Sequence, residues 1–494
     1  MTQPCNLILF MADNHNRAYA GCYGHPVAQT PTIDRIAADG VRFANAYAAS
    51  AVCCPARAAI ATGRYPHQTG YWDNSLVYDG KVPSWHHRLR EQGHTVTSIG
   101  KLHYLEEGRD YGFTDSVIPM HIVAGGGALF GLLRATDEGE RSRPSPRLQY
   151  SRTGIGDTDY VQYDQEITKH AVAWLQDHAM ARDKPWVLMV SYAAPHPPFV
   201  VSKRLMDMYP PDRMPLPPQF RPEEQPHHPA IDHIRCLHQF EELCSEEFVR
   251  NTVAGYCALI THMDEQIGAV MKSAEDLGVL ENARVAYISD HGEAAGHHGL
   301  FAKSIVHEHS LGVPFVMAGP GIPRGRVIDQ VVSHVDLFPT IVEGAGARLE
   351  GQDADLPGVS VWPAIEGTEA ERLGFAEYHG HGSKSGMFAL RDGRYKLLYF
   401  VGMPAQLFDL EVDPGETQDL IDTPDGRERA AQIEKRLREM LDPEAVDDRA
   451  KSDQRAQIER MGGVEACLSH GNYLNNPVPG REPELFGFGE EAAR

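Results

Sequence analysis

The chain has 494 residues, of which 42% are hydrophobic and 23% are charged, and this composition excludes a disordered, collagenous or coiled-coil protein. The 68 acidic residues outnumber the 46 basic ones and give a net charge of −22, which disfavours nucleic acid and anionic membrane surfaces as partners. No stretch approaches the roughly 18 apolar residues of a membrane span, and no basic segment precedes the first apolar run, so we expect neither a membrane helix nor a signal peptide.

Short apolar runs alternate with amphipathic stretches from the N-terminus onward. The runs that predict strands are residues 6–11, 95–99, 186–192, 284–288 and 313–317. The stretches that predict helices are residues 32–40, 82–93, 164–178 and 255–277. This alternation predicts an α/β fold in which a large, mostly parallel sheet is sandwiched by helices.

A proline-rich stretch (YPPDRMPLPPQFRPEEQPHHP) lies within residues 199–242. Its prolines exclude a regular helix, and its length exceeds that of an ordinary connection. We expect an ordered excursion over the face of the sheet that carries the functional site.

The sequence pattern changes near residue 375. The segment MFALRDGRYKLLYF predicts antiparallel strands joined at Asp392 and Gly393, and residues 426–441 predict a helix. We therefore expect a main domain over residues 1–374 and a smaller C-terminal α+β subdomain with an antiparallel sheet over residues 375–494. The polar tail after Asp453 is either loose or a contact with a second copy of the chain.

Residues 50–63 (SAVCCPARAAIATG) form the first chemically suggestive segment. Pro55 suits the first position of a helix and Gly63 suits its end, which places Cys53 just before a helix N-terminus. Backbone N–H groups there favour an anion, and Arg57 adds a fork that matches sulfate or phosphate oxygens. The residues alone leave open that Cys53 and Cys54 are simply buried small side chains.

The pattern C-x-P-x-R followed by A-x-x-x-T-G resembles the signature of the type I sulfatases of the alkaline-phosphatase superfamily. Further segments are similar to that family, namely MADNHN, TPTIDRIAADGVRFANAYA, GRYPHQTGYWDN, GKLHY, APHPPF, ALITHMDEQIG, ISDHGE, VPFVMAGPG and SHVDLFPT. Within the family, YGHPVAQTP and EYHGHGSKSGMFALRDGRYKLLYF resemble the branch of choline sulfatases, other alkyl and arylsulfatases and phosphonate monoester hydrolases.

This resemblance implies that Cys53 is oxidised to formylglycine by a formylglycine-generating enzyme, and that the hydrated aldehyde attacks the sulfur of the substrate. Cys54 then occupies a variable position. Ala56 replaces the serine that is usual between the proline and the arginine, whereas Cys53, Pro55 and Arg57 are all present.

A divalent metal ion is also implied. Asp13 and Asp290 each follow a predicted strand, a place where a lone aspartate is more often a cap or a turn residue. The resemblance implies that Asp13, Asn14, Cys53, Asp290 and His291 hold the metal. We expect Ca²⁺, with Mn²⁺ or Zn²⁺ as alternatives because Asn14 is neutral and His291 offers a nitrogen.

The remaining implied site residues are basic or amidic. The catalytic set is Cys53, Arg57, Lys101, His103, His196 and Lys303. The substrate-binding set is Asn74, Lys101, His196, Lys303 and His307. Taken singly, each lysine is more often solvated and each histidine more often structural. The histidines at 297, 298, 307 and 309 are interpreted as a wall of the pocket and not as a second metal site.

The predicted function is hydrolysis of an alkyl or aryl sulfate ester to an alcohol and sulfate. The alternatives are a phosphonate monoester or phosphodiester hydrolase with promiscuous sulfatase activity and a binding protein with an unmodified thiol. Residues 105–160, with glycines at 125–127 and a polar run at 137–147, do not resemble the aromatic segment that choline sulfatases place around their ammonium group.

The expected setting follows from the cysteines and the tail. The eight cysteines show neither disulfide spacing nor paired C-x-x-C motifs, which predicts a cytoplasmic protein. We expect a homodimer or homotetramer, with the sulfate ester and the formylglycine-generating enzyme as partners and without nucleic acid or membrane.

Overall fold

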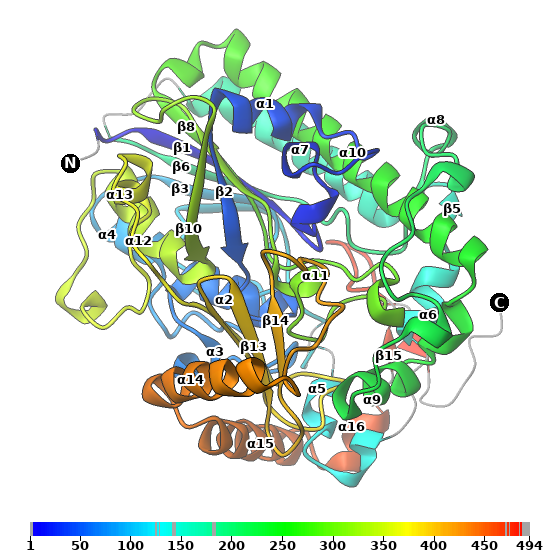
Figure 1. Ribbon diagram of the computed structural model, residues 1–494. Helices are drawn as coiled ribbons and strands as arrows, with labels where there is room; N and C mark the ends of the chain where they lie inside the picture. Colours follow the sequence, from blue (N-terminus) through cyan, green and yellow to red (C-terminus); the bar gives the residue numbers. More distant parts are fainter. Residues whose placement is uncertain are drawn as a thin grey trace.

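The computed structural model in Figure 1 consists of one large sheet flanked by helices and a second, smaller sheet. Parts of the segments discussed above lie outside the described residues. These parts are residues 124, 125, 128 and 141–144, together with residues 487–494 of the tail. The structure describes residues 3–123, 126, 127, 129–140, 145–179, 184–469, 472, 473, 475–483, 485 and 486.

The large sheet has eight strands in the order β10-β2-β9-β8-β1-β6-β3-β4. Strand β9 runs antiparallel to both of its neighbours, and all the other adjacent pairs are parallel. The strands of the chain are β1 Asn6–Ala12, β2 Gly40–Tyr47, β3 Val96–Lys101, β4 Asp115–Met120, β5 Gly154–Ile155, β6 Val187–Ser191, β7 Val200–Val201, β8 Ala283–Ser289, β9 Phe315–Ala318, β10 Arg326–Ser333, β11 Gly374–Tyr378, β12 Met387–Asp392, β13 Tyr395–Phe400, β14 Gln406–Asp409, β15 Asn472–Tyr473 and β16 Leu485–Phe486.

The mostly parallel sheet confirms the predicted fold class. The predicted strands correspond to β1, β3, β6, β8 and β9. Strands β2, β4 and β10 were not predicted, because each mixes polar with apolar residues. Strand β4 is an edge strand whose first residues are exposed, and β2 and β10 pair with each other near the opposite edge. Only strands buried on both faces show the continuous apolar run that sequence reasoning detects.

Helices cover both faces of this sheet. Helices α1, α7 and α10 pack together on one face, and α2, α4 and α12 pack on the other. The helices are α1 Pro31–Asp39, α2 Cys53–Thr62, α3 Pro66–Thr69, α4 Trp85–Glu91, α5 Phe130–Leu133, α6 Ser145–Ser151, α7 Asp159–His178, α8 Lys203–Met206, α9 Pro229–Leu237, α10 Glu246–Asp276, α11 Glu308–Leu311, α12 Leu337–Gly344, α13 Trp362–Ile365, α14 Pro424–Met440, α15 Pro443–Arg460 and α16 Val464–Ser469.

Two long helices begin earlier than the apolar periodicity predicted. Helix α7 begins at Asp159, because the Thr158 side chain accepts a hydrogen bond from the N–H of Val161. Helix α10 begins at Glu246, where Ser245 caps the N–H of Phe248 in the same way. The added residues, 159–163 and 246–254, mix polar with buried apolar side chains, so the capping residue and not the hydrophobic pattern marks where each helix begins.

The proline-rich stretch is ordered and contains only 3-10 turns before its last residue, as expected. Helix α9 begins at Pro229, the last proline of the stretch, where the missing N–H costs nothing. His238, which follows this helix, lines the cavity described below. The short helix α8 precedes the stretch, and the earlier prolines leave only 3-10 turns.

The C-terminal part contains the predicted antiparallel sheet, in the order β11-β12-β13-β14. Strands β12 and β13 are joined at Gly393, and α14 packs against them, which confirms the predicted hairpin and helix. Lys396 of β13 is buried and forms ion pairs of 2.9 Å with both Glu308 and Glu416. The domain boundary at residue 374 stays a prediction.

After the antiparallel sheet the chain returns to the main domain. Helix α15 packs against α5, where Arg134 of the adjoining loop pairs with Asp447 at 3.0 Å. The Gln454 amide donates a hydrogen bond of 2.7 Å to Asp73. All four of these polar side chains are buried, so the return is specified by hydrogen bonds as well as by apolar contact.

Among the described residues, no helix combines the length and apolar character needed to cross a membrane.

Candidate active site

Four neighbouring strands deliver polar residues to the same edge of the large sheet. Asp13 directly follows β1, and Asp290 directly follows β8. Lys101 is the last residue of β3, and Ser191 is the last residue of β6. These strands are adjacent and parallel, so their carboxyl ends meet, which is where the sites of open α/β sheets form.

Helix α2 brings Cys53 to this edge. The helix begins at Cys53, two residues earlier than Pro55 predicted, and the Asn74 side chain accepts a hydrogen bond of 3.2 Å from the N–H of Cys54. The predicted stop is confirmed at Gly63, which has a φ of 66°. A Cβ at Gly63 would lie 2.8 Å from the Cβ of Phe338. Because the helix end lies so close to Phe338, this position requires glycine.

Asp13, Cys53, Asp290 and His291 form a buried group that fits a metal ion. One ligand atom from each of these residues lies within 4.8 Å of the others. Asp13 Oδ1 and His291 Nε2 are buried without a hydrogen-bond partner among the described residues. His291 Nδ1 donates to the Gly292 carbonyl at 2.9 Å, which leaves the Nε2 lone pair to coordinate. Two carboxylates and an imidazole suit a divalent cation.

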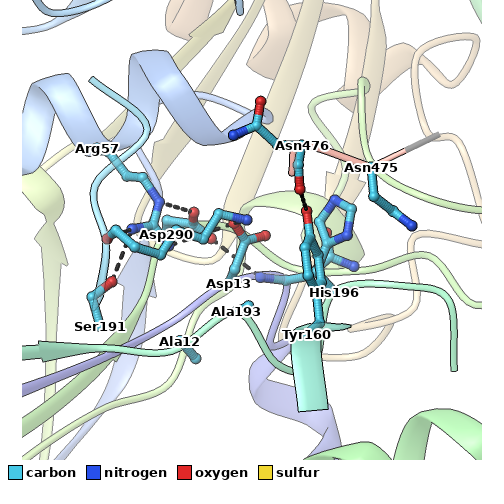
Figure 2. A network of polar contacts seen from close by, with 12 residues as sticks. Ala12, Asp13, Arg57, Tyr160, Ser191, Ala193, His196, Asp290, Asn475 and Asn476 are labelled. Carbon is cyan, nitrogen blue, oxygen red and sulfur yellow. Dashed lines mark hydrogen bonds and ion pairs between the residues drawn. The ribbon is translucent and has the colours of Figure 1, made fainter. Parts of the chain in front are cut away.

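Two basic side chains balance the carboxylates. Arg57 Nε lies 2.7 Å from Asp290 (Figure 2). Lys101 Nζ lies 2.5 Å from Asp13. Arg57 also donates to Ser191 Oγ at 3.0 Å. Burial alone would raise the pKa of Asp13, but the charge of Lys101, followed by other nearby basic groups, holds that pKa well below its usual range. Asp13 is therefore ready to act as an anionic ligand.

Asn14 lies beside this group but is not part of it. Its Oδ1 accepts a hydrogen bond of 2.8 Å from Lys303 Nζ, and its Nδ2 donates to Glu293. Tyr150 donates a second hydrogen bond of 2.6 Å to Glu293. The Asn14 amide thus connects a lysine with a buried carboxylate. The implied metal role of Asn14 stays a prediction.

A cavity of about 120 Å³ opens beside Cys53. Four of the other predicted residues line it, namely Asn74, His103, His196 and Lys303. Arg57 and Lys101 are not among the lining residues and are held in the ion pairs described above. The remaining lining residues are Cys54, Ile122, Pro146, Gln149, Tyr160, Pro197, His238, Ala302, His381, Tyr473 and Asn476.

His307 is not among the residues that line this cavity. It packs against His298 and His309, with ring centroids 5.0 Å and 5.6 Å away, and against Phe408. The interpretation of these histidines as a pocket wall therefore finds no support in the geometry. Their nitrogens do not appear among the sets of ligand atoms within 4.8 Å in the part of the chain that the structure describes.

His103 and His196, two of the histidines that line the cavity, favour their neutral forms. Burial, reinforced by the charge of Lys101, lowers the pKa of His103 well below its usual value, and neither ring nitrogen has a hydrogen-bond partner among the described residues. Burial and the charge of Lys303 lower the pKa of His196 in the same way. His196 Nδ1 donates to the Pro197 carbonyl at 2.8 Å, so Nε2 carries the lone pair. Both imidazoles can accept a proton.

Burial raises the pKa of the Cys53 thiol to about 11, and the charge of Asp13 acts in the same direction. The unmodified side chain is therefore a neutral thiol near pH 7, and a thiol is a much weaker nucleophile than a thiolate.

Sequence reasoning missed the wall that faces Cys53. The Tyr160 hydroxyl donates a hydrogen bond of 2.9 Å to the Asn476 carbonyl, and Lys101 Nζ lies 5.5 Å from the centre of the Tyr160 ring. Figure 2 shows Tyr160 and His196 next to Asn475 and Asn476 of the tail. No motif marks these positions, because the contacts join segments more than 300 residues apart, as the separation of 316 for Tyr160 and Asn476 shows.

Two family models match the chain. The model described as Sulfatase matches residues 5–347, and the model described as N-sulphoglucosamine sulphohydrolase, C-terminal, matches residues 296–443.

Curated proteins and solved structures agree with these matches. A choline-sulfatase of Rhizobium meliloti is 30% identical over 442 residues, covering 85% of this chain and 83% of the relative. Arylsulfatase K of Xenopus laevis is 26% identical over 468 residues, covering 88% and 82%. The crystal structure of a phosphonate monoester hydrolase of Agrobacterium radiobacter superposes with a TM-score of 0.69 at 22% identity, covering 88% of this chain and 94% of that one.

Proposed function

Because the chain belongs to the sulfatase family, we propose that it is a formylglycine- and metal-dependent sulfuric ester hydrolase that converts an alkyl or aryl sulfate into an alcohol and sulfate. One observation carries this proposal. Cys53, the first residue of a buried helix, shares a site of two carboxylates and an imidazole with the ion-paired bases Arg57 and Lys101.

The proposed metal site consists of Asp13, Asp290, His291 and the side chain at position 53. The unpartnered Asp13 Oδ1 and His291 Nε2 support it. When bound, a divalent cation supplies positive charge where negative charge develops on oxygen. Ca²⁺, the ion expected from the sequence, prefers six to eight oxygen ligands. Here the Asn14 oxygen is already hydrogen-bonded to Lys303, and His291 offers a nitrogen. This smaller oxygen set with an imidazole favours Mn²⁺.

Position 53 is proposed to carry formylglycine, made by a formylglycine-generating enzyme. The buried helix N-terminus beside basic side chains fits an oxygen-rich group better than a neutral thiol. When formed, the aldehyde hydrate supplies the hydroxyl nucleophile. Lys303 lines the cavity, and Lys101 lies next to Asp13 beneath it, so both lie where they can hold sulfate oxygens.

The cavity histidines are proposed to move the protons. His103 accepts a proton beside position 53, and His196 stands on the side of the cavity where the leaving alcohol departs, next to Tyr160 at 5.8 Å between rings. Asn74, which accepts from the Cys54 N–H, directs its amide toward the same cavity. Arg57 keeps Asp290 in place by charge pairing.

The deciding experiment is mass spectrometry of tryptic peptide 43–57 from protein co-expressed with a formylglycine-generating enzyme. We expect an aldehyde at Cys53 and an alkylatable thiol at Cys54. Hydrolysis of 4-nitrophenyl sulfate by the same preparation measures the activity. Two unmodified thiols in an inactive preparation would overturn the proposal.

A phosphonate monoester hydrolase is the second candidate, because structures with that activity share the fold. The ratio of kcat/KM for 4-nitrophenyl sulfate to that for 4-nitrophenyl phenylphosphonate separates the two. We expect the ratio to exceed one.

The cellular setting is also a proposal. All eight cysteines are unpaired, which supports a reducing, cytoplasmic location. We propose a homodimer or homotetramer, which size-exclusion chromatography with light scattering tests.

A further inference from the structure

Three residues near the active site have a left-handed backbone although none of them is a glycine. Asn14 has a φ of 79°, Ala295 a φ of 47° and Ala302 a φ of 67°. A left-handed backbone is unfavourable for residues with a side chain, so it persists only where the surroundings hold it. All three residues donate a hydrogen bond to the same buried side chain, the carboxylate of Glu293.

The Glu293 carboxylate accepts four hydrogen bonds. Its Oε1 accepts from the backbone N–H groups of Ala295 and Ala302, at 2.9 Å and 2.8 Å. Its Oε2 accepts from the Tyr150 hydroxyl at 2.6 Å and from the Asn14 side-chain nitrogen. Three of these four donors are N–H groups, which cannot accept a hydrogen bond in return. Both oxygens of Glu293 therefore have to act as acceptors.

Two of these contacts lead to Lys303. Ala302, whose N–H donates to Glu293, directly precedes Lys303, and Ser304 on the other side is also left-handed, with a φ of 82°. The Asn14 amide, which donates to Glu293, accepts a hydrogen bond of 2.8 Å from Lys303 Nζ. One carboxylate thus contacts the backbone next to Lys303 and, through Asn14, its ammonium group.

Lys303 is the cation that these contacts orient toward the active-site cavity. It lines the cavity together with Cys53, and 9% of the residue is exposed. A lysine side chain is a flexible four-carbon stem, so an ammonium that is free to move loses conformational entropy when it binds an anion. The hydrogen bond to Asn14 restricts this freedom before any ligand binds, which favours binding.

We propose that Glu293 is a positioning residue for sulfate binding, and that it holds the Lys303 ammonium in place through Asn14 and through the backbone of Ala302. Glu293 is not among the residues that line the cavity, so it affects a bound anion only through these neighbours. This inference rests on the proposed sulfatase activity, in which Lys303 holds sulfate oxygens, and extends it to a residue outside the cavity.

Glu293→Gln tests this role with almost no change in size. The new amide has one oxygen in place of two, so its NH₂ group must face two of the four donors. If it replaces Oε1, it faces the N–H groups of Ala295 and Ala302. If it replaces Oε2, it faces the Asn14 nitrogen, and Asn14 relieves this by turning its own NH₂ group toward Lys303. Both orientations disturb a contact that holds Lys303.

Inhibition by inorganic sulfate measures the effect in the matured, metal-loaded enzyme. With 4-nitrophenyl sulfate as the substrate, we expect the Ki for sulfate to rise about tenfold in Glu293→Gln, the effect of weakening one hydrogen bond to a charged group. KM should rise in parallel. Glu281→Gln, on the exposed turn before β8, is the matched control and should leave both constants within twofold. An unchanged Ki in Glu293→Gln would overturn the inference.

A reciprocal exchange separates positioning from a merely structural role. In the double variant Asn14→Asp/Glu293→Gln, the new amide nitrogen at position 293 donates to the new carboxylate at position 14, which still accepts from Lys303. The total charge of the pair is unchanged. We expect the Ki for sulfate to return to within about threefold of the parent. A double variant that binds sulfate no better than Glu293→Gln would contradict the contact through Asn14.

Tyr150→Phe serves as a second comparison. It removes a hydrogen bond to the same carboxylate but none that leads to Lys303. We expect a lower thermal midpoint, because a buried hydrogen bond is lost, and a Ki for sulfate within twofold of the parent. If Tyr150→Phe raised the Ki as much as Glu293→Gln does, the effect would reflect a general loosening of this region, and the positioning role would be wrong.

Calorimetry of the unmatured protein keeps the test independent of catalysis. Sulfate titrated into the Mn²⁺-loaded parent and Glu293→Gln proteins, both with an unmodified Cys53, should give dissociation constants about tenfold apart. This ratio in a protein that fails to hydrolyse 4-nitrophenyl sulfate after maturation would contradict the proposed activity and support the positioning role. Hydrolysis together with equal sulfate affinities would contradict the positioning role alone. A parent that neither binds sulfate nor hydrolyses the ester would overturn both.

Discussion

Lys303 Nζ donates a hydrogen bond of 2.8 Å to Asn14 Oδ1, although 289 residues separate the two. The same amide donates from its nitrogen to Glu293, which is fully buried. Asn14 therefore presents an acceptor to a cation and a donor to an anion. An aspartate has the same shape but offers only acceptors.

This asymmetry predicts that Asn14→Asp destabilises the protein. Its second carboxylate oxygen would face Glu293 at hydrogen-bond distance in a buried place, at a cost of about 2 kcal/mol. We expect a thermal midpoint about 2 °C lower, as a chain of this length gives. Adding Glu293→Gln restores a donor at that position, so the double variant should recover most of the midpoint. If the single variant were as stable as the parent, the donor role of Asn14 would be wrong.

Metal removal should abolish activity without unfolding the protein. Arg57 and Lys101 remain paired with Asp290 and Asp13 after chelation, so the carboxylates are not left bare. We expect EDTA-treated enzyme to lose hydrolysis of 4-nitrophenyl sulfate and to melt about 3 °C lower, the effect of losing a ligand present at 100 to 1,000 times its Kd. Mn²⁺ should restore both properties more fully than Ca²⁺. The Asp290→Asn variant should not respond to either ion.

Asp264 predicts a defined pH dependence of stability. Its carboxylate accepts hydrogen bonds of 2.9 Å from the N–H groups of Thr32 and Ile33, but burial outweighs them and raises its pKa to about 6. The unfolded value is about 3.9, so the native state binds more protons between these values and stability falls as pH rises from about 4 through 6. The loss is about 3 kcal/mol.

Asp264→Asn removes this titration. The thermal midpoint of the variant relative to the parent should be about 2 °C higher at pH 8 than at pH 4.5. Asp276→Asn, on the exposed C-terminal turn of the same helix, is the control and should shift equally at both pH values. A variant offset that is independent of pH would contradict the raised pKa.

Gly63→Ala should be more harmful than Gly24→Ala, although both glycines have a positive φ. The added Cβ at Gly63 would meet Phe338 at 2.8 Å, whereas at Gly24 no atom lies within 4 Å. We expect about 1 kcal/mol of backbone strain at Gly24 and about 2–4 kcal/mol of strain and overpacking at Gly63. Differential scanning fluorimetry of both variants measures the difference. Equal midpoints would exclude the packing contribution.

The sequence predicted those parts of the fold that local chemistry determines. Strands β1, β6 and β8 are buried on both faces and carry unbroken apolar runs. The stop of α2 at Gly63 follows from glycine preference, whereas the helix begins at Cys53, two residues before the Pro55 that the sequence marked as its first position. Strands β2 and β10 mix polar and apolar residues, because pairing with their neighbours, and not hydrophobicity, keeps them extended.

The site was predictable only where motifs mark it. Asp13, Cys53, Asp290 and His291 come together as the resemblance implied. The hydrogen bond from Asn14 to Glu293 depends on where the two side chains lie in the fold, which the spacing of residues along the sequence does not show. The contact of Tyr160 with Asn476 depends on the path of the tail, which the polar sequence after Asp453 left undetermined.

The burial of Cys53 sets an order of events during biosynthesis. Cys53 is 2% exposed, and the cavity beside it is lined in part by Tyr473 and Asn476, which come far later in the chain. Any enzyme that must bind residues 53–57 to oxidise the cysteine has to act while this part of the nascent chain is still unfolded. Because Tyr473 and Asn476 are made long after residues 53–57, that segment stays accessible until these later residues have been made and packed.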